Sequence, residues 1–171
     1  MARPAGDDAL ENREIERKFL VSSDTWRDGT PGVPMRQGYL SEGTGTTVRV
    51  RIAGVRAWLT IKGRAEHGVR PEFEYEIPVA EAESMLALCT GEIIEKERHR
   101  VPHAGHMWEV DVFAEVNQPL ITAEVELDAA DETVELPPWV GREVTGEPRY
   151  LNAALARLPY SAWPEDSRLE P

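Results

Sequence analysis

The chain has 171 residues and a formal net charge of −12, with 41% hydrophobic and 29% charged residues. This composition is typical of one globular domain with its own core and excludes a largely disordered chain. The acidic balance argues against a general nucleic-acid binder, which needs a basic face. It still allows a locally basic pocket that binds a small anion.

The ends of the chain and its single cysteine indicate the compartment. The polar N-terminal segment lacks the apolar stretch of a secretory signal, and no apolar run is long enough for a transmembrane helix. Cys89 alone cannot form an internal disulfide. We therefore expect a cytoplasmic protein without nucleic-acid or membrane partners. We expect a flexible N-terminus over residues 1–12, one domain over 13–158 and a C-terminal tail over 159–171.

Alternating apolar and polar residues, separated by short turn-rich segments, predict eight strands. In chain order they lie at about 13–21, 34–41, 46–53, 56–62, 72–79, 93–101, 107–113 and 120–128. Good helix formers with an apolar stripe predict a helix at 80–89, and a second helix at 148–158 opens at Pro148. The short connections between strands favour antiparallel pairing.

Seven of the eight predicted strands place charged side chains on one face and apolar side chains on the other. In the segment EIERK at 14–18, Glu14, Glu16 and Lys18 share a face. The same period adds acids and bases from six further strands. These are Arg49, Arg51, Lys62, Glu74, Glu76, Lys96, Arg98, Arg100, Glu109, Asp111, Glu124 and Glu126.

A solvent-facing charged side would explain any one of these strands. Two features favour an interior instead. Acids and bases segregate by strand, although like charges side by side are unfavourable, and the helices need an apolar sheet face to pack on. We therefore predict a mainly β fold, a closed eight-stranded antiparallel β-barrel with helices packed outside and the charged face inside.

The predicted interior combines two kinds of ligand group. Clustered carboxylates suit Mg²⁺ or Mn²⁺, whereas arginine and lysine suit phosphate oxygens. This combination suits phosphoryl transfer, because its catalysis consists largely of positioning and charge neutralisation.

The order of these motifs resembles the CYTH, or triphosphate tunnel metalloenzyme, family, and in particular its short, single-domain bacterial members. EIERK carries the family's Glu-x-Glu-x-Lys signature. The other matching segments are RQGYL (36–40), VRVR (48–51), LTIKG (59–63), EYEI (74–77), IEKER (94–98), EVDVF (109–113), AEVEL (123–127) and EVTGEPRYLNAALA (143–156). Glu97 departs from the family's pattern, which tends to have an uncharged residue there.

The resemblance implies an eight-stranded tunnel that acts on a triphosphate-containing substrate with Mg²⁺ or Mn²⁺. It implies catalytic roles for Lys18, Glu16 and Arg51. The implied metal ligands are Glu14, Glu16, Glu74, Glu76, Asp111, Glu124 and Glu126. The implied substrate-binding residues are Lys18, Tyr39, Arg49, Arg51, Lys62, Lys96 and Arg98.

The leading hypothesis for function is a metal-dependent hydrolase that cleaves inorganic triphosphate to pyrophosphate and phosphate. The alternatives are a class IV-type adenylate cyclase, a nucleoside or thiamine triphosphatase, and a non-enzymatic polyphosphate-binding module. We find no motif for an adenine and ribose pocket, and simple anion binding needs no clustered acids. Trp58 could line the tunnel mouth or only pack, whereas Tyr150 and Asn152 are expected to close the tunnel.

Overall fold

The computed structural model describes residues 15–42, 45–64, 71–129 and 131–168. Strands dominate this part of the chain. They are β1 (Ile15–Val21), β2 (Val33–Glu42), β3 (Thr47–Ala53), β4 (Arg56–Lys62), β5 (Glu72–Ile77), β6 (Thr90–His103), β7 (His106–Phe113), β8 (Ile121–Leu127) and β9 (Val140–Glu143). The helices are α1 (Val79–Leu86) and α2 (Asn152–Arg157), with short 3₁₀ segments at Glu115–Asn117, Pro148–Tyr150, Tyr160–Ala162 and Glu165–Ser167.

The strands form one antiparallel sheet in the order β5-β4-β3-β2-β6-β7-β8-β1-β9. The prediction of a closed eight-stranded β-barrel is therefore wrong, because this nine-stranded sheet is open, with β5 and β9 at its edges. The unpredicted strand β9 supplies the reason. It pairs with Phe19 and Val21 of β1 on the side opposite β8, so β1 has two neighbours and does not pair with β5.

All eight predicted strands are present, with ends that differ by a few residues, and β6 is longer at both ends. The second helix is shorter than predicted. Leu151 is extended, at φ −70° and ψ 139°, and separates the 3₁₀ turn Pro148–Tyr150 from α2. None of the helices in the described part of the chain has the length and apolar character needed to cross a bilayer.

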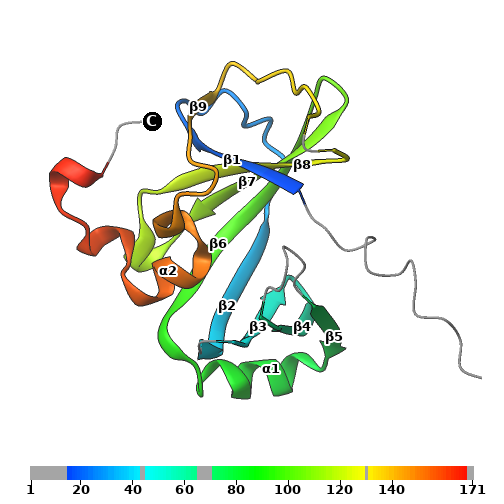
Figure 1. Cartoon of the computed structure of the whole chain (residues 1–171), viewed down its shortest axis with the longest axis vertical. Helices are drawn as coiled ribbons and strands as arrows, with labels where there is room; N and C mark the ends of the chain where they lie inside the picture. Colours follow the sequence, from blue (N-terminus) through cyan, green and yellow to red (C-terminus); the bar gives the residue numbers. More distant parts are fainter. Residues whose placement is uncertain (1–14, 43–44, 65–70, 130, 169–171) are drawn as a thin grey trace, which may run out of the picture.

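The outer face of the sheet is covered by apolar packing at two places. One of them involves α1, which lies below β3, β4 and β5 in Figure 1. Helix α1 buries Ala82 and Leu86 against Val50 and Ile52 of β3. On the outer side of β1, β7 and β8, a second cluster consists of Phe19, Val21, Trp26, Trp108, Val110, Ala123, Val125, Leu127, Val134 and Trp139. Because side chains alternate along each strand, this packing leaves the charged residues on the concave side.

A third apolar cluster closes one end of the concave side. Leu20 and Ile94 point away from the outer clusters and pack with Tyr150 and Leu155 from the C-terminal part of the chain. Tyr160 and Trp163, within the segment expected to be a tail, are also buried in this cluster, at 8% and 5% exposure. The cluster also contains Tyr39, Phe113, Leu120, Val144 and Ala156.

Candidate active site

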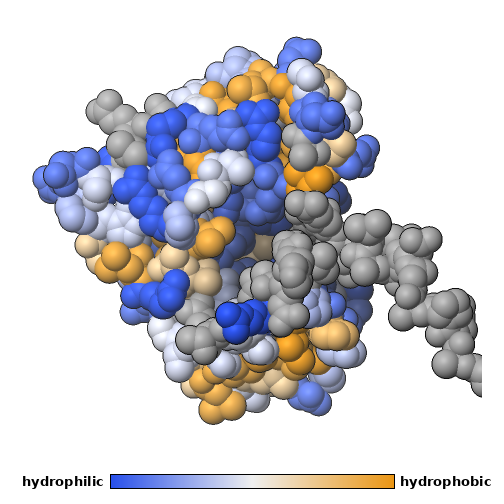
Figure 2. Space-filling model, in the orientation of Figure 1, coloured by the Kyte–Doolittle hydropathy of each residue, from blue (hydrophilic) through white to orange (hydrophobic). Residues whose placement is uncertain are grey.

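The concave side of the sheet holds a cavity of about 640 Å³. Each strand from β1 to β8 supplies at least one lining side chain, so the sheet curves around the cavity although it does not close. Leu151, Asn152 and Ala153, at the start of α2, complete the lining. Figure 2 shows hydrophilic residues around the hollow between the upper and lower parts of the molecule.

Most of the predicted site residues line this cavity. They are Glu16, Lys18, Tyr39, Arg49, Arg51, Lys62, Glu74, Lys96, Arg98, Glu124 and Glu126. Glu76 does not line the cavity, because it forms an exposed ion pair with Arg56. Asp111 is 1% exposed and lies behind the lining, and Glu14 lies outside the described residues.

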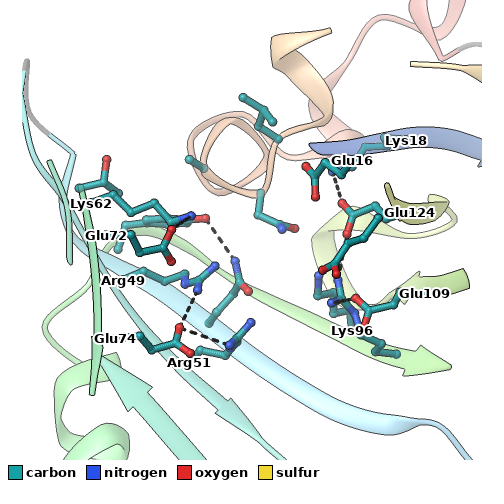
Figure 3. A pocket seen from close by; sticks show the side chains of 18 residues that line it. Glu16, Lys18, Arg49, Arg51, Lys62, Glu72, Glu74, Lys96, Glu109 and Glu124 are labelled. Atoms are coloured by element: carbon teal, nitrogen blue, oxygen red, sulfur yellow. Dashed lines mark hydrogen bonds and ion pairs between the residues drawn. The ribbon is translucent and has the colours of Figure 1, made fainter. Parts of the chain in front are cut away.

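One side of the cavity, the β3–β5 wall, consists of Arg49, Arg51, Lys62, Glu72 and Glu74 (Figure 3). Glu74 Oε2 lies 3.4 Å from Arg49 Nη2 and 3.5 Å from Arg51 Nη2, and it accepts a 2.8 Å hydrogen bond from Thr60. Lys62 Nζ lies 2.8 Å from Glu72 Oε2.

Each arginine of this wall has a hydrogen-bond donor that no acceptor among the described residues satisfies. Arg49 Nε and Arg51 Nε are buried and have no hydrogen-bond acceptor among the described residues. Burial and the nearby Arg49 lower the pKa of Arg51, because the charged form loses hydration and meets a like charge. An anion in the cavity would relieve both effects.

The opposite side is formed by β6, β7, β8 and β1, and we call it the β1–β8 wall. It consists of Glu16, Lys18, Lys96, Arg98, Glu109, Glu124 and Glu126, backed by Asp111. Lys18 and Glu124 are register partners, and Lys18 Nζ lies 2.6 Å from Glu124 Oε1. Lys18 also donates a 3.3 Å hydrogen bond to the Tyr150 carbonyl oxygen. These contacts hold the ammonium group of Lys18 at the cavity surface.

Arg98 is the central cation of the β1–β8 wall. Its guanidinium donates two hydrogen bonds of 2.7 Å to Asp111 and one of 3.2 Å to Glu124, and it forms an ion pair with Glu109. Asp111 also accepts a hydrogen bond from Lys96. The side chains of Lys96 and Asp111 are each 2% exposed, so this network is part of the protein interior.

Asp111 and Glu124 are ionised at neutral pH. Burial raises the pKa of Asp111, but Lys96 and Arg98 outweigh it and lower that pKa to about 2. Burial likewise raises the pKa of Glu124, and Lys18 outweighs it, so the pKa lies below its ordinary value. Burial also lowers the pKa of Lys96 against the opposing effect of Asp111.

The carboxylates of β1, β7 and β8 fit a hard divalent cation. Glu16 lies directly opposite Glu126, and Glu109 lies directly opposite Glu124. Like charges in such positions repel, and a cation between them reverses the repulsion. Within the described residues, no three His, Cys, Asp or Glu side chains already form a metal cluster. The oxygen donors that line the cavity nevertheless match the preference of Mg²⁺ and Mn²⁺.

Four further polar residues of the strands line the cavity, although they were not among the predicted ligands. They are Gln37, Thr47, Glu72 and Glu109. Each lies two residues along a strand from a predicted site residue. Glu109 was already placed on the charged face, and extending the two-residue period by one step finds Gln37, Thr47 and Glu72. Gln37, which is 1% exposed, donates a 3.2 Å hydrogen bond to the Tyr39 hydroxyl.

Comparison with known proteins identifies the family. The CYTH domain model matches residues 12–157. An inorganic triphosphatase of Acetivibrio thermocellus is 44% identical over 154 residues, which cover 90% of this chain and 99% of the relative. An inorganic triphosphatase of Nitrosomonas europaea is 42% identical over 151 residues, covering 84% and 96%. The crystal structure of the inorganic triphosphatase NE1496 aligns with a TM-score of 0.67 and 38% identity, covering 84% of this chain and 94% of that chain. These matches confirm the resemblance seen in the sequence, and the chain belongs to the CYTH domain family.

Proposed function

We propose that the protein is a divalent-metal-dependent inorganic triphosphatase, which hydrolyses linear triphosphate to pyrophosphate and phosphate. Two relatives that match most of the chain are named inorganic triphosphatases. The observation that carries the proposal is the β3–β5 wall, where Arg49 and Arg51 present buried Nε donors without an acceptor among the described residues. Phosphate oxygens are acceptors of the required charge and geometry.

The cavity would bind triphosphate from two sides. Arg49, Arg51 and Lys62 would bind phosphate oxygens on the β3–β5 wall, where their ion pairs with Glu72 and Glu74 are partly exposed. Lys18 and Arg98 would face the same chain from the β1–β8 wall. Placing the phosphate chain between the two walls supplies the positioning on which phosphoryl transfer depends.

Glu16, Glu124 and Glu126 would hold the divalent cation, because they line the cavity from the neighbouring strands β1 and β8. When bound there, the cation would supply neutralisation of phosphate charge and activation of the attacking water. Glu16 would also orient that water by accepting its hydrogen bond.

Lys18 and Arg51 would stabilise the negative charge that develops during bond cleavage. Lys18 is suited to this role because Glu124 and the Tyr150 carbonyl fix its ammonium group before substrate arrives. Fixed charges of this kind stabilise a transition state without reorganisation during the reaction.

The proposal is tested by incubating the purified protein with triphosphate and Mg²⁺ or Mn²⁺ and identifying the products by ³¹P NMR. We expect equal amounts of pyrophosphate and phosphate. Binding of triphosphate without turnover would contradict the proposal and favour a non-enzymatic polyphosphate-binding module. Formation of cyclic AMP in a parallel reaction with ATP, without triphosphate hydrolysis, would favour an adenylate cyclase instead.

A further inference from the structure

The segment 158–168, most of which was predicted as a C-terminal tail, follows α2 and lies beyond the residues that the CYTH domain model matches (orange to red in Figure 1). It is nevertheless fixed to the body of the protein. The backbone N–H of Tyr160 donates a 2.9 Å hydrogen bond to the buried Asn117 Oδ1. Trp163 is 5% exposed, and its Nε1 donates a 3.1 Å hydrogen bond to the Leu158 carbonyl oxygen. These contacts hold the Trp163 ring in one position.

Arg149 joins this segment to the 3₁₀ turn Pro148–Tyr150. Its guanidinium lies 4.9 Å from the ring centroid of Trp163 and 5.0 Å from that of Tyr150. It donates hydrogen bonds of 3.2 Å to the Ser167 carbonyl oxygen and 3.3 Å to the Tyr150 hydroxyl. The rings of Tyr150 and Trp163 also meet edge to face, with centroids 5.2 Å apart. Arg149, Tyr150 and Trp163 therefore pack as one unit, which we call the Arg149 cluster.

The Arg149 cluster contacts Lys18 through the backbone of Tyr150. Tyr150 is 1% exposed, and its carbonyl oxygen accepts the 3.3 Å hydrogen bond from Lys18 Nζ. The chain just before the turn also holds the Lys18 backbone, whose N–H donates to Thr145 Oγ1 at 3.0 Å and whose carbonyl oxygen accepts from Val144 at 2.8 Å. Moving the Tyr150 ring would therefore move an acceptor of the Lys18 ammonium group.

The ammonium group of Lys18 needs both of its fixed acceptors to keep its direction. It has three N–H donors. Glu124 and the Tyr150 carbonyl accept two of them and leave the third for a ligand in the cavity that Lys18 lines. Without the Tyr150 carbonyl, the long side chain could turn about its pairing with Glu124, and the third donor would lose its direction.

We propose that Trp163 and Arg149 are positioning residues, which hold the Tyr150 carbonyl where it directs Lys18 towards the substrate. The inference rests on the proposed function, because both residues act through Lys18 in the same reaction. Neither of them lines the cavity. Their loss should therefore lower kcat and leave ground-state binding to the β3–β5 wall nearly unchanged.

The first experiment measures kcat and KM for triphosphate with saturating Mg²⁺, at a temperature at which circular dichroism shows each variant to be folded. Trp163→Ala should lower kcat roughly tenfold, because small displacements of a catalytic group are costly, and change KM less than about threefold. Trp163→Phe keeps a ring for Arg149 and Tyr150 and should recover most of the lost kcat. Parental kcat in Trp163→Ala, or no recovery in Trp163→Phe, would overturn the proposal.

The matched control is Trp26→Ala. Trp26 is also 5% exposed and lies 4.2 Å from a guanidinium, that of Arg27, but it belongs to the cluster on the outer face of the sheet. Its loss should leave kcat at the parental value. A fall in kcat equal to that of Trp163→Ala would reflect the loss of any buried ring and would overturn the proposal.

The second experiment tests whether Trp163 acts through Lys18 by a double-mutant cycle. In the Lys18→Ala background, Trp163→Ala should change kcat less than about twofold, because the group that it positions is gone. If Trp163→Ala fails to fold, Arg149→Met makes the same test, since it keeps the apolar stem and removes the contacts with both rings and Ser167. Similar falls in kcat in both backgrounds would indicate a purely structural role and overturn the proposal. Absence of triphosphate hydrolysis by the parent protein would instead contradict the proposed function.

Discussion

The two walls of the main cavity contain the same kinds of charged residue but hold them differently. On the β1–β8 wall, the paired side chains of Lys96 and Asp111 are each 2% exposed, and Lys18 meets Glu124 at 2.6 Å. On the β3–β5 wall, Arg49 and Arg51 meet Glu74 only at 3.4 and 3.5 Å, and that side chain is 36% exposed.

This difference indicates that the ion pairs of the β1–β8 wall stabilise the fold, whereas the charged groups of the β3–β5 wall remain available to a ligand. Removing one member of a buried ion pair is strongly destabilising, because the other charge stays buried without a partner. A partly exposed and longer pair contributes little, because water and salt compete with it. The β3–β5 wall can therefore exchange carboxylate for phosphate at small cost, whereas the β1–β8 wall presents charges that are already fixed.

The largest effect is expected from metal removal, which disables the carboxylates of the β1–β8 wall. Excess EDTA should abolish triphosphate hydrolysis, and Mg²⁺ or Mn²⁺ should restore it, because oxygen ligands suit these cations. Glu126→Gln should raise the metal concentration needed for half-maximal activity, measured by titration. Full activity in excess chelator would contradict the assignment of Glu16, Glu124 and Glu126.

The stability of the two walls can be compared directly by urea unfolding. Asp111→Ala leaves Lys96 and Arg98 buried without their shared acid, so we expect it to lower the free energy of unfolding by about 3–5 kcal/mol. Glu74→Ala removes the weaker pairs of the β3–β5 wall and should lower it by less than about 1 kcal/mol. Similar decreases in the free energy of unfolding in the two variants would contradict the proposed difference in stability contribution between the walls.

Lys18 tests whether the fixed charges of the β1–β8 wall also serve catalysis. Lys18→Ala should lower kcat roughly 10²-fold, as expected for loss of a charged donor to the transition state. Arg17→Ala is the matched control, because Arg17 precedes Lys18 on the opposite face and pairs at 2.7 Å with Glu143. A folded Lys18→Ala protein with parental turnover would remove Lys18 from the mechanism.

The sequence predicted strand positions and faces well because both depend on local alternation. Phe19 and Leu20, for example, enter different clusters on the two sides of β1. Closure of the sheet could not be predicted in this way, since it depends on pairing between distant segments. Strand β9 has only four residues and follows the pair Pro137 and Pro138, so its pairing with β1 left no recognisable pattern.

The same limit applies to the candidate site. Alternation gives the face on which Glu74 and Glu76 lie, but it does not give their level along the strand. Glu74 lies opposite Thr60 within the cavity, whereas Glu76 lies opposite Trp58 and bonds Arg56 outside it. Alternation also does not show how deeply a side chain is buried. Asp111 shares the charged face yet is 1% exposed and lies behind the cavity lining.

The smallest predicted effect concerns binding at the β3–β5 wall, read as a change in melting temperature. Triphosphate should raise the melting temperature, because a ligand that binds only the folded state stabilises it. Arg51→Ala should weaken binding roughly tenfold and shrink this rise, whereas Arg17→Ala should preserve it. Calorimetry with chelator present keeps the ligand from being hydrolysed, and a fixed ionic strength keeps charge screening constant. The ligand-free melting temperature of Arg51→Ala has no predictable sign, because the change relieves repulsion from Arg49 and also removes a partner of Glu74. The effect on the ligand-induced rise does have a predictable sign, because Arg51→Ala should make the rise smaller. An undiminished rise in Arg51→Ala would mean that this arginine does not contact triphosphate.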